Sequence, residues 1–250
     1  MRSSELMNFF EDRFAEVEAY LSLLQGIEEA ARSGPPRIIN SDSAITASQQ
    51  KILYSSVYLQ LYNLVEATVS RCIQAITDAA TSTLASWQAA DLNAALRREW
   101  VRAIARTHID LTPDHRLENA VTMCDHLIEQ LPIHELQIDI GGGGNWDDEA
   151  IEKISARVGC NLRISGTTRE AVKRPERDDL GAMKLVKNRR NSLAHGRISF
   201  TECADGVAVE ELRRITSAVG AYLREAISCF ASYIDLFGFL RPERQPNGAA

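Results

Sequence analysis

Residues 54–76 read YSSVYLQLYNLVEATVSRCIQAI, and this stretch decides the fold class. Apolar side chains recur in steps of three and four along one stripe, which is typical of an α-helix. The members of that stripe are Tyr54, Tyr58, Leu61, Val65, Val69, Cys72 and Ile76. The neighbouring stripe, which begins at Tyr62, is also apolar except for Glu66. A helix that is apolar around most of its circumference is expected in the middle of a helical bundle.

Glu66 is a carboxylate in a part of this helix that is expected to be buried. Burying an unpaired charge is costly, so Glu66 needs a cation or a hydrogen-bond donor. The candidate partners are Arg71 and Arg190. We expect Glu66 to hold one of these arginines in its rotamer rather than to take part in a reaction itself.

The same apolar period predicts further helices on both sides of this stretch. Glycine (14) and proline (7) are sparse, and the long segments without them favour helices over a β fold with many turns. The sequence therefore predicts a mostly α chain, with one helical domain over residues 1–240 and a flexible tail over residues 241–250. The predicted helices outside the middle of the chain span about residues 4–32, 46–80, 175–195 and 207–237.

The stretch from about residue 82 to residue 168 has a different pattern and is expected to be an insertion. Its first two helices could form a separate hairpin. Part of the remainder alternates between apolar and polar residues in the manner of β-strands, so the full fold class is a mostly α bundle with a small α/β insertion. The predicted elements are helices near 92–104 and 113–131, strands at 136–140 and 161–164, and a short helix from Asp147 or Asp148 to Val158.

Composition and charge exclude several classes of protein. The formal net charge is −6, so the chain as a whole is not a polycation that coats nucleic acid. The N-terminus lacks the apolar run of a secretory signal, and the apolar run 227–240 is short for a membrane span and contains Asp235. The five cysteines are scattered, with no histidine at ligand spacing, which argues against disulfides and a zinc site. We expect a cytoplasmic protein that uses no metal or cofactor and does not contact a membrane.

One segment of the chain is locally basic. Between residues 163 and 197 ten lysines and arginines stand against four acids, a local charge of +6 that leaves the rest of the chain at −12, since −6 − 6 = −12. This basic segment is the candidate contact surface for a polyanion such as RNA. A solvated helix face is the plainer interpretation of the same residues. The candidate phosphate contacts are Lys184, Lys187, Arg189 and Arg197.

The basic segment contains the string KNRRNSLAHG, residues 187–196. On a helix, Arg190 borders an apolar stripe, where a guanidinium is costly unless it is paired. Asn191 and His195 lie four residues apart on the adjoining polar face. Gly196 suits the left-handed position just past a helix end, which places His195 in the last turn, where the helix dipole favours an imidazolium. A fixed cation, an amide and a titratable imidazole are therefore expected close together.

Arg190-Asn191 followed by Ala194-His195 resembles the R-x4-6-H motif of HEPN domains, in which a polar residue often follows the arginine. The expected helical setting agrees, because the HEPN motif lies at the end of a late helix that one more long helix follows. The resemblance covers the motif helix, the helix after it and, more loosely, the first two helices. The stretch 82–168 has no counterpart in the motif.

The resemblance implies a function. Many HEPN proteins are metal-independent endoribonucleases of toxin–antitoxin, anti-phage and CRISPR-associated systems, and they typically act as homodimers. By this resemblance His195 would be the general acid or base, Arg190 would stabilise the charged transition state, and Asn191 would orient the imidazole or hold a phosphate oxygen. The substrate would be RNA, with a 2′-hydroxyl as nucleophile and a 2′,3′-cyclic phosphate as product. An antitoxin or another defence protein would be a further partner.

Two other functions stay open at the level of sequence. One is a non-catalytic HEPN module that binds RNA, a nucleotide or a protein through the same basic surface. The other is a helical scaffold in which Arg190 and Glu66 form only a structural pair. The coincidence of Arg190, Asn191 and His195 on a basic helix favours the ribonuclease over the scaffold, but it does not separate the ribonuclease from the binding module.

Overall fold

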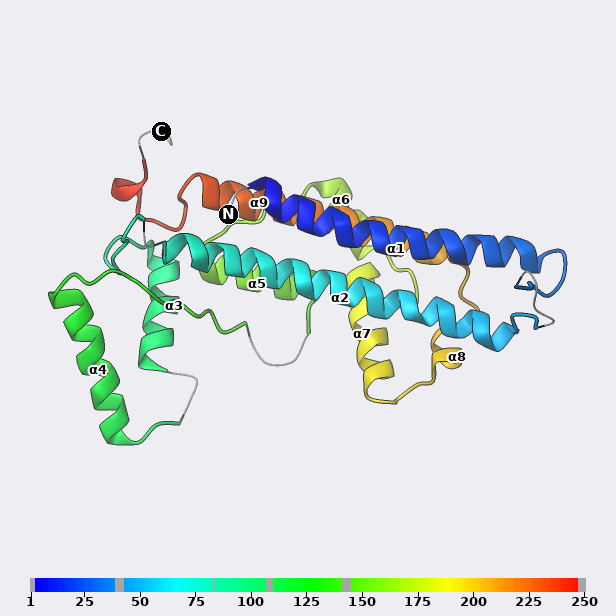
Figure 1. The fold of residues 1–250 in the computed structure, drawn as a ribbon, viewed down its shortest axis with the longest axis horizontal. Helices are drawn as coiled ribbons and strands as arrows, with labels where there is room; N and C mark the ends of the chain where they lie inside the picture. The colour runs from blue at the N-terminus through cyan, green and yellow to red at the C-terminus, as the bar shows by residue number, and fades with distance from the viewer. Residues whose placement is uncertain (1–2, 39–42, 83, 107–109, 141–144, 247–250) are drawn as a thin grey trace.

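The three longest helices pack against one another and form the core of a helical bundle. The computed structural model describes residues 3–38, 43–82, 84–106, 110–140 and 145–246. Within these residues, no helix is both long enough and apolar enough to cross a membrane. The mostly α prediction is confirmed. The core helices, which lie side by side in Figure 1, are α1 (Ser3–Ala31), α2 (Ala47–Ala80) and α9 (Val209–Asp235).

Helix α2 lies at the centre of the bundle, as its apolar circumference predicts. Thr46 begins it with a capping box: the Thr46 side chain accepts a hydrogen bond from the Gln49 N–H, and the Gln49 side chain accepts one from the Thr46 N–H. Tyr58, Tyr62 and Ile76 are fully buried. The helix contacts α1, α7, α8 and α9, so its apolar side chains are covered on several sides at once.

Helices α1 and α9 approach closely at a glycine. A Cβ atom on Gly220 of α9 would lie only 2.5 Å from the Phe14 ring of α1. Phe14 stacks on Phe10 with 5.4 Å between ring centres, and the Arg224 guanidinium covers both rings. Arg224 also forms a two-fold hydrogen bond with Glu11, at 2.6 and 2.9 Å. The absence of a side chain at Gly220 thus lets two long helices pack through their aromatic residues.

A second layer covers one side of the core. It consists of α6 (Gly166–Lys173), α7 (Ala182–Ala194) and the short α8 (Phe200–Cys203). The predicted helix 175–195 is wrong at its start, since α7 begins only at Ala182. The chain turns before it, with Asp178 and Asp179 in the left-handed region at φ 51° and 56°. Gly181 then packs so tightly that a Cβ there would lie 2.3 Å from the carbonyl oxygen of Val172.

The stretch predicted to be an insertion forms three helices at one end of the bundle. These are α3 (Ala94–Ala105), α4 (Pro113–Ile128) and α5 (Asp148–Val158), whose bounds lie close to the predicted ones. Helices α3 and α4 pack together as a hairpin, and Figure 1 shows α4 beside α3 at the edge of the molecule. Helix α5 packs on α3 through an ion pair, in which Arg157 binds the buried Glu99 at 3.0 and 2.7 Å.

The two predicted strands are wrong, because the described residues contain no β-strand and only isolated β-bridges. Residues 136–140 are extended, with Leu136 and Ile138 buried and the residues between them exposed. The alternation in sequence therefore reflects an extended segment that lies with one side on helices, not a strand in a sheet. Residues 161–164 also belong to no strand, and the glycines at 141–144 lie outside the described residues.

The predicted flexible tail begins with an ordered turn. The Arg241 N–H donates a hydrogen bond to the carbonyl of Asp91 at 2.9 Å. The 3-10 helix η1 (Pro242–Arg244) follows, and Arg244 binds the carboxylate of Asp91 at 2.7 Å. This carboxylate is nearly fully buried, so the start of the tail is held against the loop before α3. Residues 247–250 lie outside the described residues.

Candidate functional site

The motif string lies at the C-terminal end of α7. Val186 and Leu193 are buried where this helix packs against α2 and α9. The last helical residue is Ala194, and Gly196 follows with a left-handed φ of 62°. The Gly196 N–H donates to the carbonyl of Leu193 at 3.1 Å, which closes the helix. The predicted left-handed glycine is confirmed, and it places His195 directly after the last helical turn.

Arg190 is held by an aromatic ring. Its guanidinium carbon lies 4.4 Å from the centre of the Tyr62 ring on α2. Tyr62 is fully buried and Arg190 is half-buried. Such a cation–π contact is worth about 0.5–2 kcal/mol, depending on how much water is excluded. Among the described residues no carboxylate lies within ion-pair distance of Arg190, although its neighbours Lys187 and Arg189 both have one.

Glu66 forms neither of the two predicted ion pairs. Its side chain is half-buried, and among the described residues neither Arg71 nor Arg190 lies within ion-pair distance of it. The Arg71 guanidinium instead lies over the Phe9 ring, 5.7 Å from its centre. Partial exposure leaves the Glu66 carboxylate hydrated, which removes the need for a buried cation. The neighbour that contacts Arg190 is Tyr62, one helical turn before Glu66 on the same helix.

Two asparagines connect Arg190 to the segment that precedes α5. The Arg190 Nη1 donates to Asn191 Oδ1 at 2.9 Å, and the Asn191 Nδ2 donates to Asn145 Oδ1 at 3.0 Å. The next residue, Trp146, donates its backbone N–H to the Tyr62 hydroxyl at 3.2 Å. These contacts close a ring of five residues, Tyr62, Asn145, Trp146, Arg190 and Asn191, which we call the Arg190 cluster. It joins α2, α7 and the stretch 82–168.

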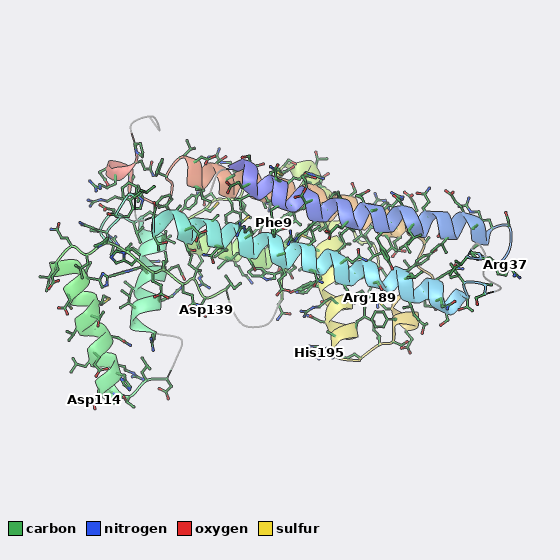
Figure 2. All side chains as sticks on the ribbon, viewed as in Figure 1. Phe9, Arg37, Asp114, Asp139, Arg189 and His195 are labelled. Carbon is green, nitrogen blue, oxygen red and sulfur yellow. The ribbon has the colours of Figure 1, made fainter. Side chains whose placement is uncertain are left out.

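His195 lies at the exposed end of α7, outside the hydrogen bonds of the Arg190 cluster. Its backbone N–H donates to the Asn191 carbonyl at 3.1 Å. Its side chain is exposed and makes no hydrogen bond or ion pair with another described residue. Figure 2 shows His195 at the tip of α7, away from α1 and α2. The Asn191 amide therefore contacts the arginine and not the imidazole, which is accessible to a ligand.

Three of the four predicted phosphate contacts bind carboxylates. Arg197, the fourth, is exposed and has no ion pair within the described part of the chain. Asp147 and Glu149 come from outside residues 163–197 and offset two of the six positive charges, whereas Asp178 is already counted in the +6, so the basic segment is less positive than its sequence suggests. The three pairs are Lys187–Asp147 at 2.5 Å, Lys184–Glu149 at 2.7 Å and Arg189–Asp178 at 2.7 Å.

The acids at the start of α5 are held in their charged form. Asp147 caps α5 by accepting the Ala150 N–H at 2.9 Å, and its other oxygen binds Lys187. Burial alone would raise the pKa of Asp147, but these hydrogen bonds and the nearby lysine charges hold it below its usual value. The hydrogen bond to Glu149 likewise raises the pKa of Lys184. Both pairs are therefore ionised at neutral pH, and a polyanion would compete with the carboxylates for the lysines.

Comparison with known families covers nearly the whole chain. The sequence model of the HEPN_MAE_28990-like HEPN family matches residues 2–239. The chain belongs to the HEPN family. The matched range runs through the stretch 82–168 as well as the core helices, so α3, α4 and α5 lie within the HEPN match. No curated protein and no solved structure matches this HEPN chain.

Sequence reasoning missed three members of the Arg190 cluster, Tyr62, Asn145 and Trp146. Tyr62 stands in the apolar stripe beside Glu66, and nothing local marks it as the residue under Arg190. Asn145 follows the four glycines and gives no periodic signal. The HEPN motif itself is visible because Arg190 and His195 lie within one short string, whereas Tyr62 and Asn145 lie in distant parts of the sequence, Asn145 being 46 positions before its partner Asn191.

Proposed function

We propose that this HEPN protein is a metal-independent endoribonuclease. His195 acts as general base or general acid, taking a proton from the ribose 2′-hydroxyl or giving one to the leaving 5′-oxygen. Arg190 stabilises the negative charge that builds on the phosphate. The nucleophile is the 2′-hydroxyl of the RNA itself, so the product carries a 2′,3′-cyclic phosphate.

The observation that supports this proposal best is the state of Arg190. Its guanidinium is fixed by Tyr62 and Asn191, yet no carboxylate among the described residues neutralises it. Of the four other residues predicted to contact phosphate, Lys184, Lys187 and Arg189 each bind a carboxylate, and Arg197 does not. An oriented cation without an acidic partner and an accessible imidazole at the same helix end are suited to phosphate chemistry.

We further propose that the working form is a homodimer, in which two copies of α7 bring their motifs into one cleft. Family membership and the exposure of His195 support this arrangement. A role as a toxin or anti-phage effector, with an antitoxin or another defence protein as partner, is proposed on family membership alone.

A second candidate function is a non-catalytic HEPN module that binds RNA, a nucleotide or a protein. The ion pairs of Lys184, Lys187 and Arg189 favour it, because paired cations contribute less to the capture of a long polyanion. The same surface would then serve recognition, with His195 and Arg190 as ligand contacts.

Cleavage of a mixed-sequence RNA in EDTA separates the two functions. Wild type is compared with His195→Ala and Arg190→Ala, and the product ends are analysed. His134→Ala and Arg98→Ala are matched controls, since both side chains are exposed and lie outside the motif and the basic segment. The proposal predicts cyclic phosphate ends from wild type and both controls, and no cutting by the two motif variants. Folded wild-type protein that binds RNA without cutting it would favour the binding module instead.

A further inference from the structure

The Tyr62 ring holds Arg190 without neutralising it. A carboxylate in that place would cancel the charge of the guanidinium, whereas the face of an aromatic ring attracts the cation through its quadrupole and leaves the net charge unchanged. The ring itself stays uncharged, because burial raises the pKa of Tyr62 above its ordinary value. Tyr62 is also fully buried on α2, so the ring is a fixed support.

The contact with the ring also leaves most N–H donors of the guanidinium without a protein acceptor. An arginine has five N–H donors that point outward in the plane of the group, and the Tyr62 ring offers them no oxygen or nitrogen acceptor apart from its hydroxyl, which instead accepts the Trp146 N–H. The described residues accept one hydrogen bond from the Arg190 side chain, the bond from Nη1 to Asn191 Oδ1. The other donors of the half-buried group have no acceptor among the described residues, and they match the oxygens of a phosphate.

The orientation of the Asn191 amide follows from its neighbours. Arg190 can only donate, so the oxygen of Asn191 must face it. The amide nitrogen then faces Asn145, where it meets the oxygen Oδ1 at 3.0 Å. Asn191 uses its oxygen and one of its two amide N–H groups within the Arg190 cluster, so these contacts align the guanidinium.

We infer that Tyr62 is a positioning residue, which holds the charged Arg190 with its N–H edge toward a phosphate group of RNA while Asn191 fixes the rotation of that edge. This inference rests on the proposed function for the identity of the anion. The face of the Tyr62 ring holds the guanidinium, whereas the Tyr62 hydroxyl accepts the hydrogen bond from the Trp146 N–H. We therefore assign the positioning of Arg190 to the ring and not to the hydroxyl.

The test compares Tyr62→Phe, which keeps the ring, with Tyr62→Leu, which removes it. Tyr58→Leu is the matched control: Tyr58 is also fully buried on α2, one turn earlier, and among the described residues no cation lies over its ring. The two leucine variants lose the same atoms from the same helix, so a shared loss of stability cancels in the comparison. Thermal unfolding of each variant checks that it is folded.

We expect Tyr62→Phe to retain kcat within about threefold, because the cation–π contact survives. Tyr62→Leu should lower kcat by about tenfold or more with little change in KM, since the misplaced charge is felt most in the transition state. Tyr58→Leu should resemble wild type in kcat. Equal kcat values for Tyr62→Leu and Tyr58→Leu, or an equal loss in the phenylalanine and leucine variants, would overturn the inference.

A second measurement does not depend on cleavage. An RNA with 2′-O-methyl groups has no nucleophile, and NMR can follow the Arg190 Nε–Hε signal as this RNA is added. We expect the Tyr62 ring to shift this signal in wild type and in Tyr62→Phe, and the RNA to move it further. Tyr62→Leu should lose the ring shift, and the RNA should then move the signal less than in wild type. If wild type cuts no RNA but these shifts are seen, the ribonuclease fails and the positioning role stands. An unchanged signal in Tyr62→Leu refutes the positioning role whether or not RNA is cut.

Discussion

Replacing Asp147 with asparagine and Glu149 with glutamine should tighten the binding of RNA. The two carboxylates engage Lys187 and Lys184 at 2.5 and 2.7 Å, and the substitutions release both cations without changing side-chain size. Each cation that then contacts a phosphate of a single strand adds about 0.7 to the slope of log affinity against log salt. Two contacts add about 1.4, which corresponds to about 25-fold in affinity at roughly 0.1 M salt. Asparagine caps a helix as well as aspartate does, so α5 should remain intact.

The assay is the fluorescence anisotropy of a labelled 2′-O-methyl RNA, titrated at several salt concentrations. The control is a double variant with the same gain of two charges, Glu16→Gln with Glu129→Gln, two exposed acids that form no ion pair with another described residue. The reasoning is refuted if both double variants tighten binding equally, since the effect would then come from net charge and not from the released lysines. It is also refuted if the salt slope of the Asp147 and Glu149 variant matches that of wild type.

Two further predictions concern stability. Gly220→Ala should lower the free energy of unfolding in urea by about 1–3 kcal/mol, because the new Cβ would lie 2.5 Å from Phe14. Gly26→Ala on α1 is the control: its Cβ meets no atom within 4 Å, so the substitution should raise the free energy of unfolding by about 0.5–1 kcal/mol. A loss in both variants would contradict the proposed cause. Arg157→Ala should lower the free energy of unfolding by about 2–3 kcal/mol. The loss is smaller than for a buried carboxylate left with no partner, because Arg102 still binds the nearly fully buried Glu99. An unchanged thermal midpoint would show that this pair contributes nothing.

The sequence predicts the long helices well because their signal is local. An apolar stripe with a period near 3.6 residues sets the bounds of α1, α2 and α9 to within two residues. Helix α4 shows the limit of that signal. Its apolar residues Leu117, Val121 and Ile128 are 65%, 50% and 77% exposed. The period predicts that a helix forms, but the path of the neighbouring chain decides which face of it is covered.

The errors in secondary structure also have local causes. Leu136 and Ile138 are buried at alternate positions, which is the pattern of a strand, but the segment has no partner strand. Sequence alternation reports one-sided burial and cannot report pairing. The predicted start of α7 is wrong because the turn before this helix contains Asp178 and Asp179 in the left-handed region. Residues other than glycine rarely adopt that conformation, so the sequence does not indicate a turn there.

The site was predictable only where it is contiguous. Arg190, Asn191 and His195 fall within six residues, and one glycine marks the helix end after them. The support of Arg190 is not contiguous, since Tyr62 and Asn145 reach it from two other segments. A sequence alone suggested a charge partner, Glu66, because burial and charge can be inferred from a pattern, whereas a ring that lies under a guanidinium cannot.

The Arg190 cluster also couples the binding of a ligand at Arg190 to the attachment of the stretch 82–168 to α7 and α2. Asn145 and Trp146 attach the stretch 82–168 to α7 and α2 through the residues that hold the guanidinium. If a ligand binds Arg190 more tightly when this attachment is formed, the bound ligand also stabilises the attachment. The factor by which the attachment raises the ligand's affinity is the same as the factor by which the ligand shifts the equilibrium toward the attached state. Any change that displaces Asn145 would therefore change the affinity at Arg190 without a direct contact with Arg190.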